Sequence, residues 1–479
     1  MPNPIEFLPE TPFNRRTLLK RSALGLGAVA LGGLLRERSV RAADDELGPH
    51  FPPRAKRIIF LCQSGAPSQI DLFDPKPELL RRQGEELPES VRDGQLLTTM
   101  TAEQRSKPLT GSAFAFAKHG NCGMELSELL PFTARQADRL CLVRSVHTEA
   151  INHDPGITFL QTGSEQPGRP SLGAWVTYGL GSENEELPAF VVLISGGEPG
   201  DQPLFGRLWG SAFLPGETQG VRFRGGREPL LYLENPSGLS EANRGRMVSA
   251  ISRLNELHFE EFGDTETQAR TRQFERAYRM QMSVPELVDL TNEPRNVLDS
   301  YGPEVEQPGT FAANCLLARR LAERDVRFIQ LYHRGWDHHT ELPTRLPKKC
   351  AQTDRPAAAF LADLAANGLL EDTLVVWAGE FGRTAYCQGE LAGGRYGRDH
   401  HPRCFSVWMA GAGVKSGFCY GRTDDFSYNI VENPVHMHDL QATLLHCLGI
   451  DHERLTFRSE GRDFRLTDVA GRVVRDVLA

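Results

Sequence analysis

The chain has 479 residues, of which 54 are lysine or arginine and 62 are aspartate or glutamate, so its formal net charge at pH 7 is −8. This acidic balance, without blocks of one charge, argues against a nucleic-acid backbone as a partner. The chain is longer than most domains built around a single hydrophobic core, so we expect one large α/β domain with insertions, or two domains.

The N-terminal segment has the features of an export signal. Arg15 and Arg16 precede the uncharged stretch "SALGLGAVALGGLL", and "VRA" at residues 40–42 offers small residues for a signal peptidase. This stretch is too short to span a bilayer core of about 30 Å, which needs about 20 residues. We therefore predict a twin-arginine signal peptide at residues 1–42 rather than a membrane-anchoring helix. The mature protein is then expected to be periplasmic or extracellular, without a stable membrane span.

Replacing both Arg15 and Arg16 by lysine is expected to abolish translocation. The paired guanidinium groups are the part of the signal that the export receptor reads, and lysine does not reproduce their planar fork. Fusion of the N-terminal segment to a reporter that is active only outside the cytoplasm measures the effect. A Lys-Lys variant that still reaches the far side of the membrane contradicts the prediction.

Six short runs rich in β-branched residues predict strands. They lie at residues 57–62, 139–146, 189–195, 326–332, 373–379 and 405–413. Between several of them, residues 124–139, 310–324 and 355–368 have apolar side chains at three- and four-residue spacing, which predicts helices. Strands that are apolar throughout and alternate with helices indicate an α/β fold with a mostly parallel central sheet and helices on both faces.

The interval 200–310 differs from its surroundings. It is rich in glycine and proline until about residue 238, and a long charged helical stretch then runs from residue 239 to about 283. We interpret this interval as an insertion that forms a cap or a lateral subdomain.

Polar clusters follow several of the predicted strands. The stretch "GAPSQID" follows the first strand, "GWDHH" follows the strand at 326–332, and "GEFGRT" follows the strand at 373–379. Ligands of such sheets bind outside the carboxyl ends of the strands. We therefore expect one edge of the sheet to bring together Gln63, His153, Asp337, Glu380 and His400.

The histidines after residue 332 suggest a metal site. Asp337 and His339 have a D-x-H spacing that lets one turn present both side chains, and "GRDHHP" adds Asp399, His400 and His401. Imidazole and carboxylate together suit a divalent transition metal such as zinc or manganese better than calcium. The alternative for each motif taken alone is a solvated histidine pair in an exposed loop.

Three further stretches contain candidate catalytic groups. In "INHDPG", His153 at a predicted helix start could be a nucleophile, an acid or a ligand, although Asn152 or Asp154 could simply cap the helix. Ser68 could act as a nucleophile or bind an anion, or it could cap a helix or turn. Arg383 could clamp an oxyanion, or it could pair with a structural acid.

Several of these stretches resemble those of a known superfamily. "NGLLEDTLVVWAGEFGR" and "HDLQATLLHCLGID" are similar to segments of sulfatases and related alkaline-phosphatase-like enzymes. "HDPGITFLQTG" is similar to the sulfatase signature, with His153 at the place of its cysteine and Pro155 at that of its proline. Across residues 14–477, the stretches "GAPSQIDLFDPKP", "NHDP", "GWDHH", "GEFGRT", "GRDHHP" and "GRDFRLTDVAGRVV" look like the twin-arginine-exported, sulfatase-like domain-of-unknown-function 1501 family. The resemblance implies an alkaline-phosphatase/sulfatase-like three-layer sandwich over residues 43–479.

The chain departs from the superfamily pattern at the metal site. The two-metal site of the superfamily takes an aspartate at the end of the first strand, where this chain has Gln63 or Ser64, and an Asp-His pair where it has Glu380-Phe381. No C-x-P-S-R occurs, so the formylglycine mechanism of ordinary sulfatases is excluded.

The resemblance implies an exported metal-dependent hydrolase that acts on a sulfate or phosphate ester of a small molecule or glycan. The implied roles are metal ligands for Asp337, His339 and His400, ligand or base for Glu380, nucleophile or proton donor for His153, anion binding for Arg383 and Ser68, and substrate contacts for Asn152, Gln63 and His401. The alternative is a catalytically reduced member that binds sulfated glycans or another exported partner on the same rim.

Overall fold

The computed structural model describes residues 47–479, apart from 93, 96, 199–200, 225–239, 263–278 and 281–282. Residues 49–479 form one compact unit. The proposed signal peptide and part of the charged stretch after residue 239 lie outside the described residues. No helix in the described ranges combines the length and the apolar character needed to cross a bilayer.

A nine-stranded sheet forms the centre of this unit, in the order β12-β4-β11-β8-β1-β7-β5-β6, with β15 added beside β4. Its strands are β1 (Arg57–Ser64), β4 (Leu140–His147), β5 (Phe190–Ser195), β6 (Val221–Phe223), β7 (Phe328–Arg334), β8 (Thr373–Ala378), β11 (Phe405–Gly411), β12 (Phe418–Tyr420) and β15 (Val435–His436). Among them, β11 runs antiparallel to both of its neighbours, and the other pairings are parallel. The six predicted strands and the mostly parallel sheet are confirmed.

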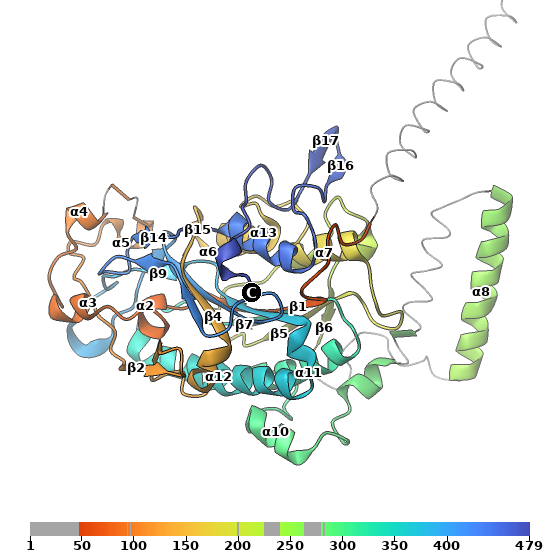
Figure 1. Cartoon of the computed structure of the whole chain (residues 1–479), viewed down its shortest axis with the longest axis horizontal. Helices are drawn as coiled ribbons and strands as arrows, with labels where there is room; N and C mark the ends of the chain where they lie inside the picture. Colours follow the sequence, from red (N-terminus) through yellow and green to blue (C-terminus); the bar gives the residue numbers. More distant parts are fainter. Residues whose placement is uncertain are drawn as a thin grey trace, which may run out of the picture. The chain divides into compact units, whose positions relative to one another are not determined.

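Helices cover both faces of the sheet (Figure 1). The α-helices in the described part of the chain, whether or not they lie on the sheet, are α2 (Gln69–Leu72), α3 (Pro77–Arg81), α4 (Glu89–Arg92), α5 (Thr99–Ala102), α6 (His153–Thr162), α7 (Leu172–Leu180), α8 (Glu241–Phe262), α10 (Arg295–Tyr301), α11 (Phe311–Glu323), α12 (Leu342–Ala366) and α13 (Met437–Cys447). In Figure 1, α6, α7 and α13 lie on one side of the sheet, and α11 and α12 lie on the other.

Strand β1 shows how the sheet joins the two halves of the core. All eight of its residues are buried. Ile58, Phe60 and Cys62 pack into the apolar cluster that includes α6, α7 and α13. Ile59 and Leu61 pack into the cluster that includes α11 and α12. This alternation is the period of two that a strand buried on both faces requires, and the result is a three-layer α/β fold.

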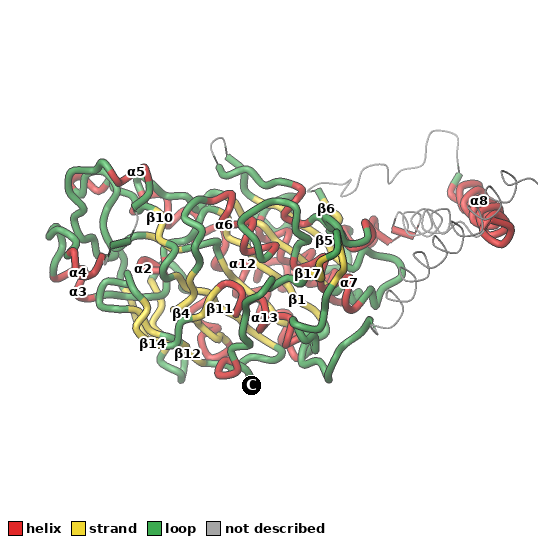
Figure 2. The backbone as a smooth tube through the Cα atoms, turned by 90° about the horizontal axis from the view of Figure 1, so that it is seen from above, coloured by secondary structure: helices red, strands yellow, loops and turns green. Residues whose placement is uncertain are grey.

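Short antiparallel pairs lie outside the main sheet. They are β2 (Phe116–His119) with β3 (Met124–Ser127), β9 (Gly382–Arg383) with β10 (His400–His401), β13 (Arg422–Thr423) with β14 (Ile430–Glu432), and β16 (Phe457–Ser459) with β17 (Arg462–Phe464). Figure 2 shows these strands and the helices in separate colours. The pair β9–β10 places His400 opposite Arg383.

The predicted helix at residues 124–139 is wrong. The segment begins as strand β3 and continues, after a break, as a short 3-10 helix over Thr133–Arg139. Pro131 explains the break, because a proline disfavours helical geometry in the residue before it. The carboxylate of Asp354 then accepts hydrogen bonds from the backbone N–H groups of Phe132 and Thr133, both at 2.8 Å, and fixes where the 3-10 helix starts.

Helix α12 is longer than the predicted helix at 355–368. It begins at Leu342 and contains Pro347 and Pro356 in its interior. Two prolines in a helical pattern normally indicate a break. Here the apolar residues Leu342, Leu346 and Cys350 are buried against the sheet, and this packing outweighs the local cost.

Candidate metal centre

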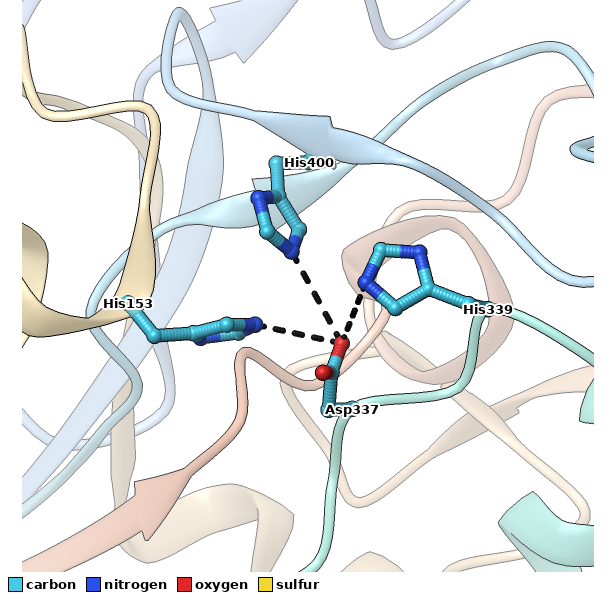
Figure 3. Close-up of side chains that lie close together, drawn as sticks. All are labelled: His153, Asp337, His339 and His400. Carbon is cyan, nitrogen blue, oxygen red and sulfur yellow. Dashed lines mark ion pairs between the residues drawn. The ribbon is translucent and has the colours of Figure 1, made fainter. Parts of the chain in front are cut away.

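Four side chains from separate segments meet at the carboxyl edge of the sheet. Asp337 and His339 follow β7, His153 begins α6 after β4, and His400 lies on β10. Strands β1, β7 and β8 are mutually parallel, and β4 runs in the same direction because both β4 and β8 are antiparallel to β11. The loops that leave these strands therefore converge, and Figure 3 shows the four side chains turned toward one another.

The distances within this group fit a single metal ion. From Oδ1 of Asp337, the Nε2 atom is 3.1 Å away in His153, 2.8 Å in His339 and 3.7 Å in His400. One ligand atom from each of the four residues lies within 4.8 Å of all the others. A tetrahedral zinc ion with bonds of 2.0–2.1 Å separates its ligands by about 3.3 Å. The three distances from Asp337 lie around this value, so the four residues could hold one metal ion.

The outer nitrogen of each histidine is held by an oxygen atom. Nδ1 of His153 is 2.6 Å from Oε1 of Glu380, and Nδ1 of His339 is 2.5 Å from Oε1 of Gln388. Nδ1 of His400 is 2.8 Å from the carbonyl oxygen of Ile151. Each Nδ1 must donate its hydrogen to such an acceptor, so each Nε2 keeps a lone pair.

The three Nε2 atoms are buried and have no hydrogen-bond donor facing them in the described part of the chain. In the neutral rings these lone pairs face the Asp337 carboxylate and repel it unless a positive charge, a metal ion or a proton on Nε2, lies between them. Metal-bound histidines commonly have this arrangement, with an outer acceptor that fixes the ring and the tautomer. The donor set of three imidazoles and one carboxylate therefore fits a divalent transition metal.

Burial and neighbouring charges shift the pKa values of these groups. Burial lowers the pKa of His400 to about 4, which keeps its imidazole neutral at pH 7. Burial also opposes the charged form of Asp337, but Arg383 and the three histidines outweigh it and hold the pKa of that carboxyl far below its ordinary value. For His153, burial lowers the pKa, while hydrogen bonds and charge from Asp337 and Glu380 raise it above the ordinary value.

The group is buried on one side and open on the other. His153 is 7% exposed and His400 is 4% exposed. The side chains of Asp337 and His339 are 19% and 18% exposed, so a small molecule would approach from their side. The amide nitrogen of Gln202 donates a 3.0 Å hydrogen bond to Oδ2 of Asp337 at this opening.

Glu380 and Arg383 also belong to the centre. Oε1 of Glu380 accepts hydrogen bonds from His153 and, at 2.9 Å, from the backbone N–H of Gly65. Arg383 donates a 2.6 Å hydrogen bond to Oδ1 of Asp337 and is itself 1% exposed. Arg383 is therefore paired with an acid of this group, and not with an acid outside it.

Ser68 and Asn152 lie outside the group. Ser68 precedes α2, and its hydroxyl donates a 2.5 Å hydrogen bond to Asp71, which forms a fully buried ion pair with Arg398. Asn152 precedes α6 and is exposed, and its side chain makes no capping hydrogen bond. Neither side chain contacts the four converging residues through a hydrogen bond recorded for the described chain.

Gln63 and His401 also face other surroundings. Gln63 pairs in register with His333, and its buried amide has no hydrogen-bond partner among the described residues. His401 packs against Tyr428 in a tilted arrangement with ring centroids 4.3 Å apart, and its Nε2 is 2.8 Å from the Tyr428 carbonyl oxygen. Both side chains are fully buried, so a substrate cannot reach them without a rearrangement.

Two residues at the centre were not indicated by the sequence. Gln388 orients His339, and Gln202 contacts Asp337 across 135 residues. Glutamine belongs to no recognisable metal-site motif. Each of these two residues lies in a loop whose path depends on the whole fold. Only the requirement of a metal-bound histidine for an outer acceptor hints that such residues exist.

Replacing Glu380 by alanine is expected to weaken metal binding by about 10- to 100-fold, because His153 then loses the acceptor that fixes its ring and its tautomer. Glu380→Gln keeps an oxygen acceptor at the same reach and should lose less. Competition with a chromophoric chelator measures the affinity of each variant. An unchanged affinity in Glu380→Ala would show that Glu380 does not orient a ligand.

The chain was compared with known families and structures. The family model described as "Protein of unknown function (DUF1501)" matches residues 55–478. No curated protein matches the chain.

Solved structures with similar backbones include three bacterial proteins. A protein in the alkaline phosphatase superfamily from Vibrio parahaemolyticus has a TM-score of 0.36 at 10% identity, over 86% of this chain and 73% of its own. The PsFucS1 sulfatase from Pseudoalteromonas sp. has a TM-score of 0.33 at 11% identity, over 83% and 68%. The phosphonate monoester hydrolase SpPMH from Silicibacter pomeroyi has a TM-score of 0.31 at 13% identity, over 72% and 71%.

Proposed function

Since the chain belongs to the DUF1501 family, whose description assigns no activity, we propose a function from its own residues: a metal-dependent hydrolase of sulfate or phosphate esters. The proposed ligands are His153, Asp337, His339 and His400, and the proposed metal is zinc or manganese. The ester belongs to a small molecule or a glycan. Export by the twin-arginine route and action in the periplasm or outside the cell are part of the same proposal.

One observation carries this proposal. Three Nε2 lone pairs and one carboxylate oxygen converge at ligand spacing, on a rim where Asp337 and His339 remain partly open to solvent. Structural zinc sites are closed and often rich in cysteine, whereas catalytic sites keep a position open. Neither thiolate nor full burial occurs among these four residues.

The bound metal would polarise the ester and favour deprotonation of a water molecule near neutral pH. The chain's residues supply the rest. Glu380, Gln388 and the Ile151 carbonyl hold the three imidazoles in the tautomer that presents Nε2. Of the three roles open to His153, that of ligand fits best, because both of its nitrogens are engaged within the group.

Purified protein loaded with zinc or manganese is expected to hydrolyse a generic aryl sulfate or aryl phosphate, and a chelator should remove this activity. Turnover restored by adding the metal back ties the activity to the centre. The matched control is His400→Ala, which lacks one of the four donors but keeps the rest of the rim. Hydrolysis that persists at the parent rate in His400→Ala would assign the activity elsewhere.

A second candidate is a catalytically reduced protein that binds sulfated glycans or another exported partner. The observation that favours it is the completeness of the donor set, because four protein ligands already fill the shell of a tetrahedral ion. Metal-loaded protein without turnover of either ester, but with measurable binding to a sulfated glycan, would support this candidate over the hydrolase.

A further inference from the structure

Arg383 is held in a cradle made of oxygen atoms. Its Nε donates to the carbonyl of Ala66 at 2.9 Å, and its Nη1 donates to the carbonyl of Arg398 at 3.1 Å. Its Nη2 donates both to the carbonyl of Gly65 at 2.5 Å and to Oδ1 of Asp337 at 2.6 Å. Every nitrogen of the guanidinium therefore contacts a protein oxygen, and four of its five N–H donors have a protein acceptor.

The backbone around this cradle is shaped to surround a cation. Gly65 has φ +111°, and a Cβ there would lie 2.6 Å from the backbone nitrogen of Asp337, so no larger residue fits. Ala66 has φ 59°, in the left-handed region that alanine rarely adopts. These two unusual conformations turn consecutive carbonyl oxygens toward the guanidinium of Arg383.

Hydrogen bonds from the side-chain amide of Gln69 fix the backbone of Arg383. Gln69 accepts a 2.7 Å hydrogen bond from the Arg383 backbone nitrogen and donates a 2.8 Å hydrogen bond to the Arg383 carbonyl. The pairing of β9 with β10, in which Arg383 lies opposite His400, also holds Arg383 in place. The position of the positive charge is therefore set from both sides before any ligand arrives.

Arg383 shares one oxygen with the proposed metal. Oδ1 of Asp337 receives the guanidinium and also faces the three Nε2 atoms. Oδ2 of Asp337 accepts from Gln202. Among the described residues, no other group of three or more histidine, cysteine or acidic side chains is close enough to hold a metal. A second metal ion beside Asp337 would have to displace a buried cation of like charge that four protein oxygens already hold.

We infer that the Arg383 guanidinium is the built-in second cation of this centre, which limits the site to one metal ion and holds Asp337 in place as its ligand. The inference rests on the metal site proposed above. With one divalent metal, one guanidinium and the carboxylates of Asp337 and Glu380, the centre carries a net positive charge. Such a charge suits an anionic ester as substrate.

Metal content separates this inference from the proposed function. After loading with excess zinc or manganese and removal of unbound ions, elemental analysis is expected to find one metal ion per chain. Two ions per chain would overturn the inference while leaving the metal site intact. An absence of bound metal would remove the metal site itself, and the inference with it.

Chemical rescue of Arg383→Ala tests the cradle directly. The variant keeps the oxygens of Gly65, Ala66, Arg398 and Asp337 but loses the cation between them. We expect its metal affinity, measured by chelator competition, to fall at least about 10-fold, and millimolar guanidinium chloride to restore it. Sodium chloride at the same concentration should restore nothing.

Two further variants complete the test. Asp337→Ala lacks the ligand itself, so guanidinium should not restore its metal binding. Arg383→Lys retains a cation with fewer donors, so it should bind one metal ion with an affinity between those of the parent and Arg383→Ala. If Arg383→Ala does not fold, the metal affinity and metal content of Arg383→Lys test the inference instead. Parent-like affinity in Arg383→Ala, or failure of guanidinium to raise it, would overturn the inference.

Discussion

Replacing Asp337 or His339 by alanine should lower the affinity for the metal by more than about 100-fold, because each supplies a donor that water cannot match in a site already shaped for the ion. His153→Ala should have an effect of the same size if His153 is a ligand. Elemental analysis of purified variants, followed by chelator competition, gives the comparison.

His338 is the matched control for this experiment. It lies between two of the proposed ligands and is 1% exposed, but neither of its ring nitrogens has a partner in the described part of the chain, and it is not one of the four converging residues. His338→Ala should therefore retain most of the metal. Equal loss in His338→Ala and His339→Ala would mean that the wrong histidine has been assigned. No loss in either variant, with metal present in the parent, would move the site away from this loop.

The second large effect concerns His333 and acid stability. His333 is 2% exposed, and its ring nitrogens face Ser195 at 3.0 Å and Gln352 at 3.3 Å. Burial, followed by the charge of Lys349, lowers the pKa of His333 to about 3. In the unfolded chain the same imidazole has a pKa of about 6.5. Between about pH 6.5 and pH 3, His333 therefore binds a proton in the unfolded chain but stays neutral in the folded chain.

The sign of the effect follows from this difference. Because the unfolded state binds more protons, the free energy of unfolding falls as the pH drops from about 6.5 toward 3, at up to roughly 1.4 kcal/mol per pH unit from this residue. Between pH 6.5 and pH 5 the loss is about 2 kcal/mol.

His333→Gln removes the titrating group but keeps a hydrogen-bonding side chain. Its unfolding free energy, from denaturant titrations at pH 6.5 and pH 5, should fall by about 2 kcal/mol less than that of the parent. The difference between the two proteins isolates His333 from the other histidines that titrate over the same range. Identical pH dependence in both proteins would show that His333 is not held neutral in the folded state.

The sequence pattern was sufficient for the sheet because its strands are apolar on both faces. Residues 57–62 and 373–379 could be placed from composition alone, and β1 and β8 occupy them. Residues 124–139 misled the prediction because their helical spacing continues across Pro131, and the backbone follows the proline instead. Helix α12 shows the opposite case, where burial against the sheet overrides two prolines.

The convergence of Asp337, His339 and His400 could be expected from the rule that loops at the carboxyl ends of parallel strands share one edge. The environment of Arg383 could not be expected from the sequence. Its acceptors are backbone carbonyls of Gly65, Ala66 and Arg398, which leave no trace in residue type. Gln63 lies within β1, where it pairs in register with His333. His401 comes directly after His400 on β10, and the alternation of side chains along a strand directs it elsewhere.

The wide separation of the four proposed ligands along the chain has a kinetic consequence. His153 and Asp337 are 184 residues apart, and Asp337 and His400 are 63 apart, so the centre is complete only when loops from distant parts of the chain have docked. We therefore expect the full set of donors to form only after the folding transition state, so that the metal ion gains its affinity late. Interactions that form late slow unfolding without speeding folding. Bound metal would therefore slow unfolding and lengthen the lifetime of the folded state, while the folding rate would stay almost unchanged.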